Sequence, residues 1–120
     1  MGPVALDASV AIGFLERGDG HHERAVEALR GAEGAPLSMS ASAYAETLVR
    51  PLALGRDEIV ERFVDALEVE VVPVDRDVAR RAATLRAEHG SLRLPDALVL
   101  AAAQIRGARL LTFDERLAQL

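Results

Sequence analysis

Four short apolar runs, separated by segments with helical patterns, constrain the fold of this chain more than any other feature. They are Pro3 to Asp7, Leu37 to Ser40, Val69 to Val74 and Ala108 to Thr112. Short runs of this kind are typical of buried strands. Strands that alternate with helices predict a parallel sheet with helices on both faces. We therefore expect a single α/β domain over residues 1–120, a three-layer α/β/α sandwich with a short, mostly parallel sheet of four or five strands.

The helices are expected between these runs, where apolar residues recur at helical spacing. Asp75 is a candidate N-cap, and Pro95 stands where proline is preferred, at the start of a helix. The segment Asp96 to Ile105 is apolar on nearly every side, which is typical of a buried helix. The expected helices are Ala8 to Leu15, His21 to Ala32, one that begins at Ser42, Asp57 to Leu67, Asp75 to His89, Asp96 to Ile105, and a last one that opens at Asp114.

The composition excludes several classes of function. The chain has no cysteine, which excludes disulfides, thiolate zinc sites and a cysteine nucleophile. All 14 basic residues are arginine, so there is no lysine to hold phosphate in a P-loop or to form a Schiff base. The net charge of -5 disfavours nucleic-acid binding by charge alone, although bound cations can reverse a local potential. No apolar segment is long enough to span a membrane and no signal peptide is recognisable, so we expect a cytoplasmic protein.

Four acidic residues lie at the places where a functional crevice is expected. Asp7 ends the first strand and Asp114 follows the fourth, and parallel strands end at the same edge of a sheet. Asp96 opens the buried helix, and Glu46 borders the apolar face of an earlier helix. Each has a structural alternative: an N-cap for Asp7 and Asp114, a favourable charge at a helix start for Asp96, and an ion pair with Arg50 for Glu46.

Taken together, the four acids indicate a metal centre. Carboxylates that are close together either take up protons or bind cations. Oxygen ligands without cysteine favour Mg²⁺ or Mn²⁺ over Zn²⁺. One or two such ions can activate water and stabilise the oxygens of a phosphodiester under attack. Ser9 and Thr112 could hydrogen-bond the ligands or their waters.

Other polar residues near the acids have less specific roles. Arg50 and Arg93 flank the acids, and either could hold RNA phosphate, with Arg93 the stronger candidate. His21 and His22 are adjacent, so they cannot form a helical metal-binding pair, and we expect neither to lie near a strand end. Tyr44 is expected in the core rather than at a base-stacking surface.

The acid-bearing segments resemble those of PIN domains, and specifically of VapC-type toxins from toxin–antitoxin pairs. The similar segments are Leu6-Asp7-Ala8-Ser9, the helix with Glu46, Leu94-Pro95-Asp96-Ala97 and Leu111-Thr112-Phe113-Asp114, in the family's order and spacing. The segment His21-His22-Glu23-Arg24-Ala25 also resembles the second helix of many such toxins. The chain ends at Leu120, whereas many relatives continue into another edge strand, so we expect a short last helix.

The resemblance implies an α/β/α fold and an Mg²⁺- or Mn²⁺-dependent endoribonuclease. It implies Asp7, Glu46, Asp96 and Asp114 as ligands of one or two ions, with Ser9 or Thr112 assisting. The implied partners are RNA (tRNA, rRNA or mRNA), a VapB-like antitoxin that often inserts a basic side chain into the acidic pocket, and a second copy of the chain. Exposed apolar residues between Glu46 and Leu67 would suit such a homodimer.

Several alternatives remain open from the sequence. The chain could be a PIN-like RNA-processing nuclease outside a toxin pair, and a small antitoxin gene directly upstream would separate the two cases. It could also be a non-catalytic binding module, which the retention of all four acids disfavours. A receiver domain would need paired acids after the first strand and a lysine. A haloacid-dehalogenase-type phosphatase would need an acid where Ser9 stands.

Overall fold

A four-stranded parallel sheet forms the centre of the protein, as a computed structural model describes it for residues 2–120. The strands are β1 (Val4–Leu6), β2 (Leu37–Ser40), β3 (Glu70–Val72) and β4 (Arg109–Leu111). Their order is β3-β2-β1-β4, and all three pairings are parallel. The predicted α/β architecture with a parallel sheet is therefore confirmed. Of the two expected strand numbers, four is correct, because the described residues after β4 form a helix instead of a fifth strand.

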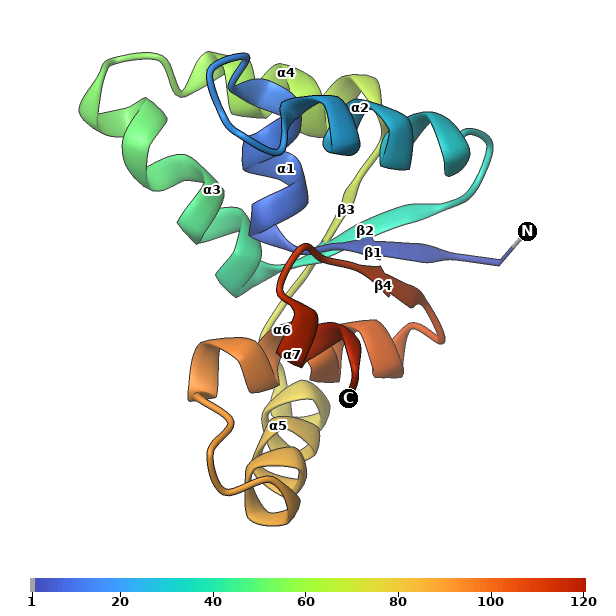
Figure 1. Cartoon of the computed structure of the whole chain (residues 1–120). Helices are drawn as coiled ribbons and strands as arrows, with labels where there is room; N and C mark the ends of the chain where they lie inside the picture. The colour runs from blue at the N-terminus through green and yellow to red at the C-terminus, as the bar shows by residue number, and fades with distance from the viewer. Residues whose placement is uncertain (1) are drawn as a thin grey trace.

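Helices cover both faces of the sheet. The helices are α1 (Ala8–Leu15), α2 (His22–Gly31), α3 (Ala41–Ala53), α4 (Glu58–Ala66), α5 (Arg76–Glu88), α6 (Leu94–Ile105) and α7 (Glu115–Ala118). Helices α1, α2 and α4 lie on one side of the sheet, and α5 and α6 lie on the other (Figure 1). None of the helices in residues 2–120 is both long and apolar enough to cross a membrane.

The strand order reverses at β1, and this reversal locates the functional crevice. From β1 the chain moves outward to β2 and then β3, whereas β4 returns to the opposite side of β1. Leu6 pairs with Leu111, so β1 and β4 end side by side. In open parallel sheets, ligands bind outside the carboxyl ends of the strands where the order reverses. Here that point is the junction of Asp7 and Thr112.

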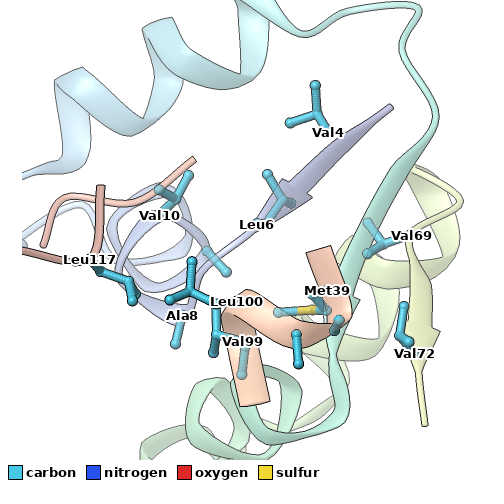
Figure 2. Close-up of a cluster of buried hydrophobic side chains, with 14 of the residues drawn as sticks. Val4, Leu6, Ala8, Val10, Met39, Val69, Val72, Val99, Leu100 and Leu117 are labelled. Carbon is cyan, nitrogen blue, oxygen red and sulfur yellow. The ribbon is translucent and has the colours of Figure 1, made fainter. Parts of the chain in front are cut away.

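The core explains why β1 is central. All three β1 residues are buried, and Leu6 and Met39 are among the largest side chains that are completely buried. Figure 2 shows Leu6 in one buried cluster with Val10 of α1 and Leu100 of α6. The middle of α6 is also buried and is rich in alanine, as predicted, which lets the helix approach the sheet closely. The segments that carry Asp7 and Asp96 are therefore attached to one rigid core.

Two helix starts show how side chains set the element boundaries. Asp75 caps α5 as predicted, because its Oδ1 accepts a hydrogen bond from the Val78 N–H at 2.9 Å. The predicted start of α3 at Ser42 is wrong. Ser40, the last residue of β2, is the N-cap, and its Oγ accepts from the Ala43 N–H at 3.0 Å. The strand therefore passes directly into the helix that carries Glu46.

Two polar contacts join elements at the surface. Arg106 Nε and Nη2 donate to the two carboxylate oxygens of Glu70, each at 2.9 Å. This bidentate pair lowers the pKa of Glu70 and links the end of α6 to β3. The Tyr44 hydroxyl donates to Glu61 at 2.6 Å, and this hydrogen bond raises the pKa of Tyr44. The Tyr44 ring packs against the core, as predicted.

Candidate metal-binding site

Asp7 connects three segments at the end of β1. Its N–H donates to the Leu111 carbonyl at 2.9 Å, which extends the pairing of β1 with β4. Its Oδ1 accepts from the Ala8 N–H at 2.8 Å and caps α1. Its Oδ2 accepts from Ser9 Oγ at 3.2 Å and from Thr112 Oγ1 at 2.6 Å. The capping role and the contacts across the sheet coexist because each uses a different carboxylate oxygen.

The loop from Thr112 to Asp114 forms the matching side of the site. Thr112 Oγ1 donates to Asp7 and also accepts from the Asp114 N–H at 3.1 Å. Ser9 Oγ accepts from the Phe113 N–H at 3.1 Å. Asp114 Oδ1 caps α7 by accepting from two backbone N–H groups, at 3.0 and 3.2 Å. Two hydroxyl groups thus tie the loop after β4 to the carboxylate after β1.

Asp96 and Asp114 line the same pocket, which has a volume of about 480 Å³ and also includes Arg93 and Arg116. Asp96 lies in the first turn of α6 and is partly buried, with 24% of its side chain exposed. The first turn stays at the surface because Leu94 itself is exposed. Arg93 Nε lies 3.8 Å from Asp96 Oδ2, but the Arg93 side chain is 76% exposed. An exposed pair at this distance holds Asp96 only weakly.

Glu46 lies apart from this pocket. It is an exposed residue of α3 and lines a smaller groove, formed by α1 and α3, that also contains Ile12 and Arg50. Within residues 2–120, Glu46 and Arg50 form no ion pair with each other. The helix of Glu46 begins at the carboxyl end of β2, the other neighbour of β1. Glu46 therefore belongs to the same end of the sheet without sharing the pocket of Asp96 and Asp114.

Carboxylates are suitable ligands for Mg²⁺ or Mn²⁺, but the acids in the described residues do not form a complete coordination site. No group of three or more acidic or histidine side chains that could hold a metal ion occurs in residues 2–120. Each acid instead contacts a different group. Asp7 accepts from the Ser9 and Thr112 hydroxyls, and Asp114 accepts from N–H groups at the start of α7. Asp96 lies near the exposed Arg93. Asp96 Oδ1 and Asp114 Oδ2 accept no hydrogen bond from the described part of the chain. Two carboxylate oxygens at the pocket therefore remain available to a hard cation.

The expectation that His21 and His22 lie away from strand ends is wrong for His21. The His21 ring packs on Phe113, directly beyond β4, with ring centroids 4.8 Å apart. Arg24 lies over the same ring, 4.5 Å from its centroid. Arg116 in the pocket was also not anticipated, although it follows Asp114 by only two residues. His21 and Arg24 could not be placed beforehand, because their position depends on how α2 packs across the sheet.

Comparisons with known proteins identify the family. The family model described as the PIN domain matches residues 4–120. The chain belongs to the PIN domain family. No curated protein matches it. The matched residues include all four strands, so the fold of this PIN domain was predicted from the sequence.

Several solved structures resemble this PIN domain. A toxin–antitoxin complex from Klebsiella pneumoniae contains a chain that is 26% identical, with a TM-score of 0.74 and coverage of 94% of this chain and 88% of the other. VapC20 from Mycobacterium tuberculosis, a sarcin–ricin loop cleaving toxin, is 18% identical, with a TM-score of 0.79 and coverage of 97% and 93%. VapBC2 from Rickettsia felis, bound to a DNA fragment from its promoter, is 16% identical, with a TM-score of 0.72 and coverage of 99% and 92%. The last two likenesses establish the fold alone.

Proposed function

We propose that this PIN domain is a metal-dependent endoribonuclease and the toxin of a VapBC-type toxin–antitoxin pair. The observation that carries the proposal is the junction of β1 and β4, where Thr112 joins Asp7 to the backbone of Asp114. Asp114 in turn shares its pocket with Asp96. Asp7 and Asp114 thus follow neighbouring strands at the end of the sheet where α/β proteins bind ligands, and Asp96 lines the pocket of Asp114.

The residues at the proposed metal site have different roles. Asp7, Asp96 and Asp114 would hold the cation, and Glu46 would approach from α3, where its exposed side chain has room to turn. Bound Mg²⁺ or Mn²⁺ would neutralise phosphate charge and make water a better nucleophile. Ser9 and Thr112 fix the orientation of Asp7 by donating to one of its oxygens. The N–H groups at the start of α7 fix Asp114 in the same way.

Chelation tests the proposed function directly. The purified protein should cut tRNA or an rRNA loop in the presence of Mg²⁺ or Mn²⁺, and EDTA should reduce cleavage to background. Excess Mg²⁺ added after EDTA should restore cutting, because the carboxylates themselves are unchanged. Cleavage products of end-labelled RNA on a gel provide the measurement. Cleavage that persists in EDTA would contradict metal dependence.

We also propose Arg93 as a contact to RNA phosphate, with Arg50 as a second one beside Glu46. Arg93 is largely exposed at the rim of the pocket, where its guanidinium can bind a phosphate oxygen. Arg93→Ala should raise KM for RNA with kcat nearly unchanged, and should lower the salt dependence of binding by about 0.7 in the log–log slope. Arg30→Ala, which removes an exposed arginine from α2, is the matched control. A lower kcat with unchanged KM would mean that Arg93 orients Asp96 and does not contact RNA.

A VapB-like antitoxin is the protein partner that we propose. The chain from the Klebsiella pneumoniae toxin–antitoxin complex and VapBC2 share this fold over nearly their whole length. An open pocket with two acids could also accept a basic side chain from an antitoxin, in competition with the cation. Since the proposed substrate is cellular RNA, we place the protein in the cytoplasm.

A homodimer through α3 is the oligomeric state that we propose. Ala45, Val49 and Leu52 form an exposed apolar stripe at helical spacing, with Val49 67% and Leu52 56% exposed. Light scattering should give twice the chain mass of 12.8 kDa. Val49→Glu should give the monomer mass, whereas Ala83→Glu, the same charge on an exposed position of α5, should leave the dimer intact. A monomeric native protein would contradict this arrangement.

A further inference from the structure

The loop that carries Asp114 lies between a short edge strand and a short terminal helix. It follows β4, an edge strand of three residues that pairs only with β1. It precedes α7, which has four residues, of which only Leu117 is buried. Edge strands and short terminal elements open more readily than the core. The side chains that hold this loop therefore matter for where Asp114 lies.

The segment from His21 to Ala25 supplies such contacts from the start of α2. The His21 ring stacks on Phe113 at 4.8 Å with an interplanar angle of 31°. The Arg24 guanidinium lies 4.5 Å from the centre of the same ring, well within cation–π range. Arg24 Nη1 also donates to His21 Nδ1 at 3.3 Å. The two side chains contact each other and Phe113.

The start of α2 is itself firmly attached to α1, which makes it a suitable anchor. His22 Nδ1 donates to the Gly13 carbonyl at 2.8 Å. Ala25 is completely buried, and a Cβ added to Gly13 would lie 3.2 Å from the Ala25 Cβ. This close approach leaves little freedom between the two helices. The Asp19 carboxylate further fixes His21 by accepting its N–H at 2.8 Å.

Phe113 connects this anchor to the acids. Its N–H donates to Ser9 Oγ, and Ser9 Oγ donates to Asp7. Its neighbours on either side are Thr112, which donates to Asp7, and Asp114, whose N–H donates back to Thr112. Contacts from α2 to the Phe113 ring therefore restrain the backbone that positions the Thr112 hydroxyl and the Asp114 N–H.

We propose that His21 and Arg24 are positioning residues, which hold the Phe113 ring and thereby keep Thr112 and Asp114 in place beside Asp7. Neither residue needs to touch metal or RNA for this role. The inference deepens the proposed function, since it concerns the geometry of the same acids. Its structural part, the restraint of the loop, does not depend on RNA cleavage.

Amide hydrogen exchange in the metal-free, full-length protein measures the restraint. In His21→Ala and in Arg24→Ala, the Phe113 and Asp114 amides should each exchange about two- to fivefold faster, while core amides of β1 stay unchanged. Mn²⁺ affinity, measured by calorimetry, should fall about two- to tenfold. With RNA, kcat should fall at limiting Mn²⁺ while KM for RNA stays constant.

Conservative variants distinguish a role in positioning the Phe113 loop from a general loss of stability of the fold. His21→Phe keeps a stacking ring and Arg24→Lys keeps a cation, so both should restore slow exchange and Mn²⁺ affinity. Arg24→Gln removes the charge but keeps most of the side-chain length, so it should behave like Arg24→Ala, even if the alanine variants fold poorly. Arg30→Ala on the same helix should change none of these values.

Two results would overturn the inference. One is unchanged exchange at Phe113 and Asp114 in Arg24→Gln and both alanine variants. The other is a higher KM for RNA with exchange and Mn²⁺ affinity unchanged, which would make the pair a direct RNA contact. If the native protein neither cut RNA nor bound Mn²⁺, the proposed function would fail, yet the exchange measurement would still decide whether the loop is held from α2.

Discussion

Asp7→Asn is expected to reduce RNA cleavage by more than about 100-fold, because replacing a metal ligand should cost more than the 10–100-fold typical of residues that contact only the ligands. The substitution removes the negative charge at the junction of β1 and β4 while keeping the shape of the side chain. Initial rates of cleavage at saturating Mg²⁺ provide the measurement. Asp7→Asn cleaving as fast as the native protein would remove Asp7 from the site.

The fold should survive this substitution, which makes the loss of activity interpretable. Asparagine is as good an N-cap as aspartate, so its side-chain oxygen can still accept from the Ala8 N–H. The hydroxyls of Ser9 and Thr112, which donate to Oδ2 of Asp7, can instead accept from the Nδ2 amide group of asparagine. Asp7→Ala lacks any cap and should lose about 1 kcal/mol of unfolding free energy. A comparison of the two variants by urea unfolding therefore separates the role of Asp7 in the helix from its role in chemistry.

Leu6→Ala should lower the free energy of unfolding by about 2–5 kcal/mol, the cost of truncating a completely buried leucine. Leu6 is fully buried on the central strand, directly before Asp7. The loss is a large share of a total stability of roughly 5–15 kcal/mol, so the variant should unfold at a clearly lower urea concentration than the native protein. Urea unfolding monitored by circular dichroism gives the value.

Leu94→Ala is the matched control, because it makes the same truncation at an exposed position in the first turn of α6. Its effect should stay within about 0.5 kcal/mol, as is usual for surface substitutions. A loss below about 1 kcal/mol for Leu6→Ala would mean that the core around β1 is less tightly packed than the structure indicates.

The fold was predictable because its signals are local. The apolar run Leu37–Ser40 has the observed bounds of β2, and Ala8–Leu15 has those of α1. The error at Ser42 arose because Ser40 and Ser42 are equally good caps on chemical grounds. Which one is used depends on where β2 stops pairing with β3, at the partners Ser40 and Val72. That boundary is a property of the sheet and cannot be read from the residues alone.

The site was predictable only in part, because it depends on strand order. That Asp7 and Asp114 leave the same end of the sheet follows from parallel strands. That they are neighbours requires β4 to pair with β1, which no local pattern encodes. The positions of Glu46 and Asp96 depend on how α3 and α6 pack, and the contact of His21 with Phe113 depends on how α2 packs. The acids that directly follow strands were therefore easier to place than the acids within helices.

The central claim is that the acids at the end of the sheet bind a divalent cation, and a crystal soaked in Mn²⁺ tests it most directly. We expect an anomalous-scattering peak coordinated by carboxylate oxygens of Asp7 and Asp96, at about 2.0–2.4 Å, with Asp114 completing the site. A map with no peak between these residues, or with the Arg93 guanidinium in that place, would contradict it.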